Sequence, residues 1–190
     1  MGQPDQVTSR WVWIDLEMTG LDVEQDVILQ IATVITDSEL NELASLEQVV
    51  WQPDEVLARM TPFVRDMHGK NGLRDRVRAS ATSLRVAERH TMELLCAHVP
   101  YGQGILAGAS ISTDRSFLRR YMTSIDGYLH YRHLDVTSLK IACSAWLGEA
   151  GMPPEVESPH TALEDIRQSI ADLRFYRDLV LDRHTAPSKG

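Results

Sequence analysis

Aliphatic residues dominate three runs near the start of the chain. These runs extend from Trp11 to Met18, from Val27 to Thr36 and from Leu43 to Trp51. Runs of this length that are rich in Val, Ile and Leu predict β-strands. The turn-forming sequences Gly20-Leu-Asp and Asp37-Ser separate the runs, and such sequences favour tight reversals of the chain. We therefore predict an antiparallel meander of three strands.

The pattern changes to helical spacing from Pro53 onward. Helices are predicted near Asp54 to Met60, Thr61 to His68, Gly72 to Ala79, Ser83 to His98, from Ser112 onward, from Thr137 to Leu147 and from Thr161 to Leu181. Two short apolar runs, Gly104 to Ala109 and Arg132 to Asp135, are predicted to be strands between these helices. Gly148 to Pro159 contains two glycines and three prolines and is predicted to be a loop.

Strands followed by alternating strands and helices indicate an α/β fold, a mixed β-sheet flanked by α-helices. A chain of 190 residues, 43% of them hydrophobic, fits one domain with one core. We expect a flexible N-terminus over residues 1–9, a single domain over residues 10–182 and a disordered tail over residues 183–190.

Charge is unevenly distributed along the chain. The net charge of −8 argues against a protein that tracks long nucleic acids, because such binding depends on Lys and Arg. Twelve acids and two bases precede residue 61, whereas seven bases and three acids lie between Arg65 and His90. An acidic half could hold cations and a basic segment could meet phosphates. A solvated surface with random asymmetry is the alternative.

The location of the protein and the state of its cysteines follow from simpler features. The apolar runs are too short to span a bilayer, and the N-terminus lacks the order of a signal peptide. We therefore expect a cytoplasmic protein with no membrane partner. Cys96 and Cys143 stand far apart without a Cys-x-x-Cys motif, so neither a disulfide nor a zinc site is indicated. Both are expected to be buried.

Three acidic motifs are candidates for chemistry. Asp15 and Glu17 interrupt a core strand at a spacing that puts both side chains on one face. A buried pair of carboxylates needs cations, although a solvated strand face would also accept it. Asp114 lies in the first turn of a predicted helix, where acids also serve as caps. His160 and Asp165 end a loop and enter the next helix, positions that a solvated pair could equally occupy.

Together these motifs resemble the DEDD exonucleases of the branch whose last motif is His-x-x-x-x-Asp. The segments Asp15-Leu-Glu-Met-Thr-Gly-Leu21, Ile28-Leu-Gln-Ile-Ala and Leu134-Asp-Val-Thr-Ser-Leu-Lys140 are similar to the oligoribonuclease family within that branch. The resemblance extends from Trp11 to about Leu181. It implies an RNase H-like fold and removal of nucleotides from the 3′ ends of very short RNAs, the last step of RNA degradation.

Metal chemistry fits this resemblance. Four carboxylates within about 4 Å of one another would repel by roughly 4 kcal/mol per pair at an effective dielectric near 20, so bound cations are needed. Two divalent ions serve phosphodiester hydrolysis elsewhere, and oxygen ligands favour Mg²⁺ or Mn²⁺ over zinc. We expect Asp15, Glu17, Asp114 and Asp165 to hold the ions and His160 to act as the base.

The resemblance also implies residues that hold the substrate. Leu21 and Phe63 would pack against the terminal bases, with His68 nearby; the family usually has Trp where Phe63 stands. Alternatively, Leu21 and Phe63 are plain core residues. Ser110, Arg132 and Thr137 would cap a 5′ phosphate, which limits the substrate to dinucleotides and slightly longer pieces.

The resemblance further implies a homodimer in which Tyr131 reaches the partner's site. Trp51 and Trp146 could serve such an interface or belong to the core. Two positions in the cap depart from the family pattern. Thr137 replaces the usual serine and keeps its hydroxyl, whereas Ala109 replaces the usual asparagine and removes an amide.

Three other functions are compatible with parts of the pattern. A proofreading-type DNA exonuclease would share the five catalytic residues and lack the phosphate cap. A noncatalytic relative would have lost a carboxylate, and none is missing here. A phosphatase of the Asp-x-Asp type would need a second Asp where this chain has Glu17.

Overall fold

Five strands form one mixed sheet in the computed structural model, which describes residues 10–154 and 161–185. The order is β3-β2-β1-β4-β5, with β1 at the centre. The strands are β1 (Trp11–Met18), β2 (Ile28–Thr36), β3 (Glu42–Val49), β4 (Ile105–Gly108) and β5 (His133–Asp135). β1, β2 and β3 pair antiparallel, whereas β4 pairs parallel with both β1 and β5. The predicted meander and the predicted mixed sheet are therefore confirmed.

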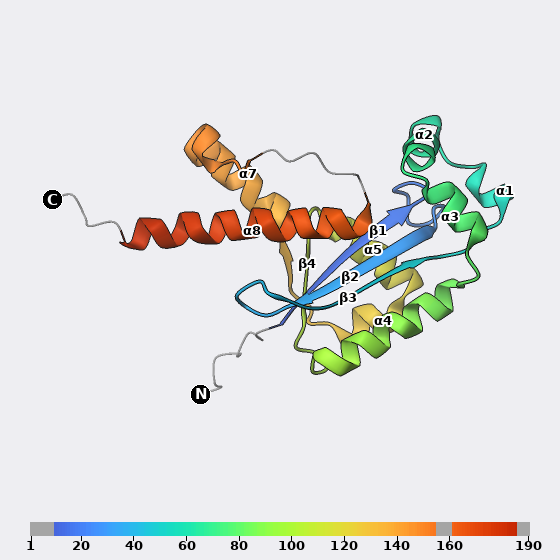
Figure 1. Cartoon of the computed structure of the whole chain (residues 1–190), viewed down its shortest axis with the longest axis horizontal. Coiled ribbons are helices and arrows are strands. Elements are labelled where there is room, and N and C mark those ends of the chain that lie inside the picture. The colour runs from blue at the N-terminus through green and yellow to red at the C-terminus, as the bar shows by residue number, and fades with distance from the viewer. Residues whose placement is uncertain (1–9, 155–160, 186–190) are drawn as a thin grey trace.

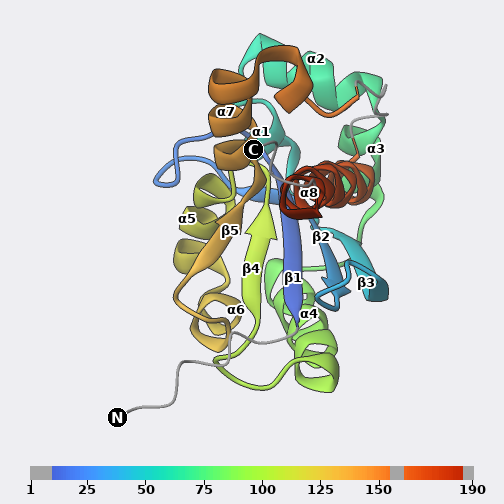
Figure 2. The ribbon, with the colours of Figure 1, turned by 90° about the vertical axis from the view of Figure 1, so that its left-hand side faces the viewer.

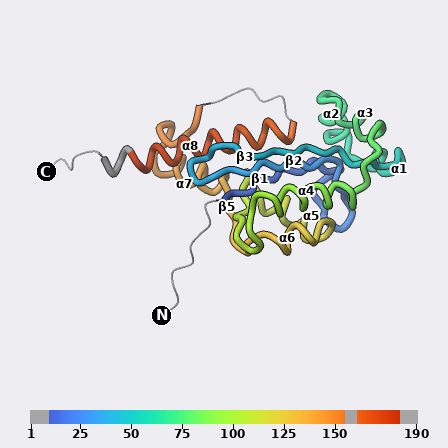
Figure 3. The backbone as a smooth tube through the Cα atoms, turned by 60° about the horizontal axis from the view of Figure 1, so that its bottom comes forward, coloured from blue at the N-terminus to red at the C-terminus, as the bar shows by residue number. Residues whose placement is uncertain are grey.

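Helices cover both faces of this sheet (Figures 1 and 3). One face carries α4 (Leu84–His98), α5 (Ser112–Tyr121) and α6 (Thr123–Tyr128), and the other carries α8 (Ala162–Thr185). α1 (Asp54–Leu57), α2 (Pro62–Lys70) and α3 (Leu73–Ala79) form an arm near the end of β1, and α7 (Val136–Leu147) is followed by the 3₁₀ helix η1 (Gly148–Gly151). Figure 2 shows α8 nearly end-on beside β1.

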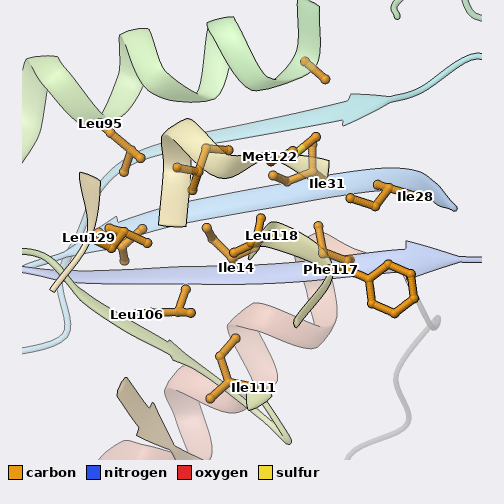
Figure 4. Packing of buried hydrophobic residues seen from close by; sticks show 14 of the residues in the cluster. Ile14, Ile28, Ile31, Leu95, Leu106, Ile111, Phe117, Leu118, Met122 and Leu129 are labelled. Carbon is orange, nitrogen blue, oxygen red and sulfur yellow. The ribbon is translucent and has the colours of Figure 1, made fainter. Parts of the chain in front are cut away.

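The alternation of side chains along β1 divides the core into two parts. Val12, Ile14 and Leu16 point toward α4, α5 and α6 and pack with residues of those helices, as Figure 4 shows for part of this cluster. Trp13 points to the opposite face and packs under α8. The odd-numbered positions of β1 therefore face α8, which decides where the two acids of this strand lie.

α8 crosses the sheet on one apolar stripe. Its buried hydrophobic positions recur at helical spacing and are Ala162, Ile166, Ile170, Leu173 and Tyr176. They cover Trp13 of β1 and Ala32 and Val34 of β2. Because the stripe begins at the first residue of the helix, the first turn of α8 is held against the sheet.

Several local predictions need correction. α6 was not predicted, because six residues that include Gly127 carry too little apolar periodicity to indicate a helix. η1 occupies the start of the predicted loop. Cys96 is exposed and Cys143 is half-buried, so the expectation that both are buried is wrong. Cys96 lies one position from the buried stripe of α4, which places its side chain toward solvent.

The predicted boundaries of the domain are only partly described. α8 continues to Thr185, so residues 183–185 of the predicted tail belong to a helix. Residues 1–9, 155–160 and 186–190 lie outside the described residues, and with them the whole predicted N-terminal segment and His160. Among the helices of the described residues, none combines the length and the apolar character needed to cross a membrane.

Candidate active site

Two acids of β1 lie on the face of the sheet that α8 covers. Asp15 and Glu17 continue the row begun by Trp11 and Trp13, and both side chains are half-buried. Their position is past the end of the β4 pairing, which extends along β1 only from Trp11 to Trp13. Asp15 and Glu17 therefore lie on the part of β1 that β4 does not pair with.

The first turn of α8 brings a third acid to this pair. Asp165 offers a carboxylate oxygen that lies, with one oxygen each of Asp15 and Glu17, in a group whose atoms are all within 4.8 Å of one another. The helix backbone fixes Asp165, because its amide donates to the Thr161 carbonyl (2.9 Å). Residues 150 positions apart in the chain thus meet because the apolar stripe of α8 packs on β1 and β2.

Asp114 approaches the same strand from the opposite side. It lies in the first turn of α5, is buried, and its Oδ1 accepts a hydrogen bond from the backbone N–H of Leu16 (2.9 Å). This N–H belongs to the residue between the two β1 acids. Asp114 therefore attaches α5 to β1 at the point where β4 no longer pairs with the strand.

Burial and mutual repulsion make these acids hard to ionise in the absence of cations. The pKa of Asp15 is raised to about 9, mainly by burial and in addition by the charges of Asp114, Glu17 and Asp165. Burial also raises the pKa of Glu17 to about 7, with contributions from Asp165 and Asp114, while Arg76 opposes the shift.

The pKa of Asp114 rises to about 7 for related reasons. Burial is again the largest cause, and the charge of Asp135 adds to it. Hydrogen bonds from the amides of Leu16 and of Asp114 itself favour the ionised form and limit the shift. Three carboxyls with raised pKa values on neighbouring elements form an electrostatically unfavourable group at neutral pH.

The residues present fit a divalent metal ion. A buried carboxylate is stable when paired with a cation, and the oxygens of Asp15, Glu17 and Asp165 are close enough together to share one. All three ligands are carboxylate oxygens, the donors that hard divalent cations prefer. This cluster is able to bind metal.

His68 is buried behind Glu17. Its Nε2 lies 2.9 Å from the Met18 carbonyl, and its Nδ1 lies 3.9 Å from Oε2 of Glu17. Burial lowers the pKa of His68, although the Met18 carbonyl opposes this, so the ring favours its neutral form. The histidine of α2 thus borders the acid cluster from inside the protein, where its ring has no exposed surface. His160, the predicted base, lies outside the described residues.

Two large apolar side chains project into solvent near the acids. Leu21, on the loop after β1, and Phe63, at the start of α2, are each 77% exposed. The alternative that they are core residues is therefore wrong. Asp26 orders the loop that carries Leu21, because its carboxylate accepts from the Thr19 hydroxyl (2.8 Å) and the Asp22 amide (2.9 Å). Asp26 is a residue that the motifs did not identify, and only the contacts of its side chain indicate its role.

Ser110 and Thr137 meet at the ends of β4 and β5. Their hydroxyl oxygens are 3.2 Å apart, and the Ser110 amide donates to Oγ1 of Thr137 (2.9 Å) and Oδ1 of Asp135 (2.9 Å). Ser110 has a left-handed backbone (φ 51°), which turns its amide toward these acceptors. Asp135, also missed from the sequence, additionally accepts from the Thr137 amide and caps α7.

Tyr131 and Arg132 lie at the other end of β5, in the segment that joins it to α6. Tyr131 is exposed, and the Arg132 guanidinium carbon lies 5.2 Å from the centre of its ring. The ring of His130 also lies against Tyr131, with the two ring centres 4.4 Å apart. The structure therefore brings Ser110 and Thr137 together and places Tyr131 and Arg132 as a second pair at the opposite end of the strand.

The sheet and its acid cluster define an exonuclease, and a family model described as Exonuclease matches residues 12–173. Among curated relatives, oligoribonuclease from Francisella tularensis is 47% identical over 177 residues, which cover 93% of this chain and 98% of that protein. Oligoribonuclease from Pseudomonas aeruginosa is 46% identical over 168 residues, which cover 88% and 93%. The chain belongs to the oligoribonuclease family and is a hydrolytic 3′-to-5′ exonuclease.

Solved structures support the same fold. Exonuclease I from Methylocaldum szegediense has a TM-score of 0.67 and 20% identity, and the match covers 89% of this chain and 40% of that one. E. coli Exonuclease I in complex with a dA16 oligonucleotide has a TM-score of 0.68 and 20% identity, covering 90% and 41%. The chain spans about two fifths of these larger proteins, and the likeness shows the exonuclease fold, as the sequence predicted.

Proposed function

We propose that this enzyme degrades very short RNAs, dinucleotides and slightly longer fragments, to mononucleotides from their 3′ ends with two divalent ions, Mg²⁺ or Mn²⁺. The observation that carries the proposal is the meeting of Asp15, Glu17 and Asp165 within 4.8 Å, with Asp114 of α5 hydrogen-bonded to the strand that carries the first two. Such a group is strongly stabilised at neutral pH when cations neutralise it. It occurs in a chain of the oligoribonuclease family.

Four carboxylates hold the ions in this proposal. Asp15, Glu17 and Asp165 supply oxygens from the α8 side, and Asp114 supplies its second oxygen, because Oδ1 is occupied by the Leu16 amide. Bound divalent ions supply an activated water and stabilise the leaving oxygen of a phosphodiester. The protein's own contribution is to keep the acids converged, through the packing of α8 and the contact of Asp114 with β1.

His160 accepts the proton of the attacking water. Neutral imidazole is the side chain best suited to this role near pH 7. The residue precedes α8 by two positions, so its backbone is attached to the helix that carries Asp165. His160→Ala should slow the chemical step more than it weakens metal binding.

The 3′-terminal bases stack against Leu21 and Phe63. Both side chains are exposed, and both lie on segments next to the acids of β1. Contacts with base faces tolerate any sequence, which suits an enzyme that must degrade all short RNAs. His68 stabilises the end of β1, just before the loop that carries Leu21, through its contact with the Met18 carbonyl.

The 5′ phosphate of the short substrate is held by Ser110, Arg132 and Thr137. Ser110 and Thr137 present adjoining hydroxyls at the N-terminus of α7, where helix amides favour an anion. Arg132 supplies the guanidinium. Asp135 accepts hydrogen bonds from the same amides, so an anion bound there needs a cation to offset the charge of this carboxylate.

A homodimer completes the enzyme. α7 is an apolar helix whose only buried residue is Val136, whereas Ile141 is exposed and Trp146 is 78% exposed. A helix of this composition needs a partner surface, and a second copy supplies it. Tyr131 is exposed beside Arg132 and reaches the partner's site. The enzyme acts in the cytoplasm, where short RNA fragments arise.

A time course on RNAs of graded length, each with a 5′ phosphate, tests this function. Dinucleotides should disappear fastest, and a chelator should stop the reaction until Mg²⁺ or Mn²⁺ is restored. Asp165→Asn should abolish hydrolysis, whereas Glu164→Gln, its neighbour on the exposed side of α8, should not. Faster hydrolysis of long single-stranded DNA than of RNA dinucleotides would contradict the proposal.

A further inference from the structure

Arg115 is a buried cation directly after Asp114 on α5. Arg115 is only 3% exposed, and its guanidinium makes four hydrogen bonds. One N–H donates to the Asp126 carboxylate on α6 (2.9 Å), which balances the charge. A buried Arg without such partners would cost several kcal/mol, so these contacts account for its burial.

The other three hydrogen bonds reach consecutive backbone carbonyls. Nη2 donates to the carbonyl of His130 (3.0 Å), and Nη1 donates to those of Tyr131 (2.9 Å) and Arg132 (3.3 Å). The planar, forked arrangement of guanidinium donors permits this, whereas a Lys ammonium could not reach all four acceptors in the same directions. Arg115 therefore fixes the backbone of residues 130–132, which we name the α6–β5 loop.

Fixing these carbonyls directs the side chains of the loop outward. Three carbonyls turned inward to one guanidinium leave Tyr131 and Arg132 exposed to solvent. The Arg132 amide donates to Nδ1 of His130 (3.1 Å), and the Arg132 guanidinium stacks on Tyr131. The loop is thus held in one arrangement before any substrate is present, and preorganised groups bind an anion without losing freedom.

We propose that Arg115 is the positioning residue that gives the enzyme its selectivity for a 5′-phosphorylated end. It does not touch the substrate. It holds the α6–β5 loop against α5, so that Tyr131 and Arg132 face solvent in one arrangement, ready for the phosphate. This inference rests on the proposed function, because it assumes that Arg132 contacts the 5′ phosphate.

The test compares two substrates, an RNA dinucleotide with a 5′ phosphate and the same dinucleotide with a 5′ hydroxyl. The measured quantity is the ratio of their kcat/KM values. Because both values come from one enzyme preparation, loss of folded protein cancels from the ratio. Arg115→Lys keeps the charge and should lower the ratio by about tenfold, mainly through KM of the phosphorylated substrate, as expected when charge-assisted hydrogen bonds are lost.

Arg119→Ala is the matched control. Arg119 is exposed, lies on the same helix and contacts the same Asp126 carboxylate, but has no contact with the loop. Its removal should leave the ratio unchanged. Adding Arg115→Lys to Arg132→Ala should cause no further loss of selectivity, because the two residues act through one contact.

The outcomes distinguish failure of the proposed role of Arg115 from failure of the proposed function of the enzyme. If wild type shows no preference for the phosphorylated dinucleotide, the proposed function fails. If wild type shows the preference and Arg132→Ala removes it, while Arg115→Lys keeps it, only the inference is overturned.

Should Arg115→Lys not fold, Asp126→Asn replaces it. That variant keeps the guanidinium and loses the carboxylate that orients it, so the ratio should fall about threefold. An unchanged ratio in that variant would likewise overturn the inference.

Discussion

Removal of divalent ions should make the stability of this enzyme strongly dependent on pH. Burial and mutual repulsion raise the pKa values of Asp15, Glu17 and Asp114. The folded protein without ions therefore binds protons more tightly than the unfolded chain does. Stability from these groups is fully present below their ordinary pKa values of 3.8 to 4.5, and it is lost as the pH rises through about 7 to 9.

The magnitude follows from the shift of a single group. The pKa of Glu17 rises from 4.5 to about 7, and at about 1.36 kcal/mol per pKa unit this amounts to about 3 kcal/mol. The acids titrate together, so their separate shifts do not add. If the loss of stability equals the value for Glu17 alone, the midpoint of thermal unfolding should be about 6–12 °C lower at pH 8.5 than at pH 5 for a chain of this size.

Thermal unfolding in chelator, at several pH values between 5 and 8.5, measures this effect. Mn²⁺ should flatten the dependence, since bound cations remove the repulsion. Asp15→Asn removes the acid with the most raised pKa, so it should stabilise the protein in chelator at pH 8.5 by about 1–3 kcal/mol and have little effect at pH 5. The same variant should be inactive.

Glu93→Gln provides the control. Glu93 is an exposed acid on α4 that pairs with Arg89, and its replacement should leave the pH dependence as it is in wild type. If Asp15→Asn destabilises the chelated protein equally at both pH values, the acids do not repel one another, and the argument for bound cations loses its physical basis.

Three further predictions concern the surface of the enzyme. Leu21→Ala and Phe63→Ala should each lower kcat/KM by about tenfold, the scale of one lost base contact, with no change in thermal unfolding. Asp26→Ala should raise KM because the loop that carries Leu21 loses two hydrogen bonds, an effect that Leu21→Ala should mask. Trp146→Glu should convert a dimer to a monomer in analytical ultracentrifugation, whereas an unchanged sedimentation coefficient would place the interface elsewhere.

Periodicity in the sequence was sufficient to predict most of the fold. The meander and α8 carry strong apolar patterns, because each buries a complete face. α6 has six residues with one buried member, Ile125, so its helical pattern is too short to recognise. Residue type alone was also insufficient to predict the exposure of Cys96. Cysteine is usually buried, but the position of Cys96 on α4 directs its side chain toward solvent.

The acid cluster was predictable because metal chemistry restricts residue type. Asp15 and Glu17 stand out in a strand where carboxylates are costly. The exposure of Leu21 and Phe63 was not predictable in this way, since apolar residues are common both in cores and on surfaces. Arg115 gave no signal either, because an Arg in a helix is ordinary until its burial is known.

Asp114 and Arg115 are adjacent in the sequence but hold α5 to different parts of the protein. Both are buried in the first half of α5, yet they point to different neighbours, Asp114 to β1 and Arg115 to α6 and the α6–β5 loop. A shift of α5 would therefore move the acid and the loop together. The contacts with β1 and with the loop are hydrogen bonds to backbone groups, so they depend on the position of the helix, whereas the contact with α6 depends on the Asp126 carboxylate. In the proposed function, the first half of α5 thus fixes both an acid of the metal site and the loop that carries Arg132.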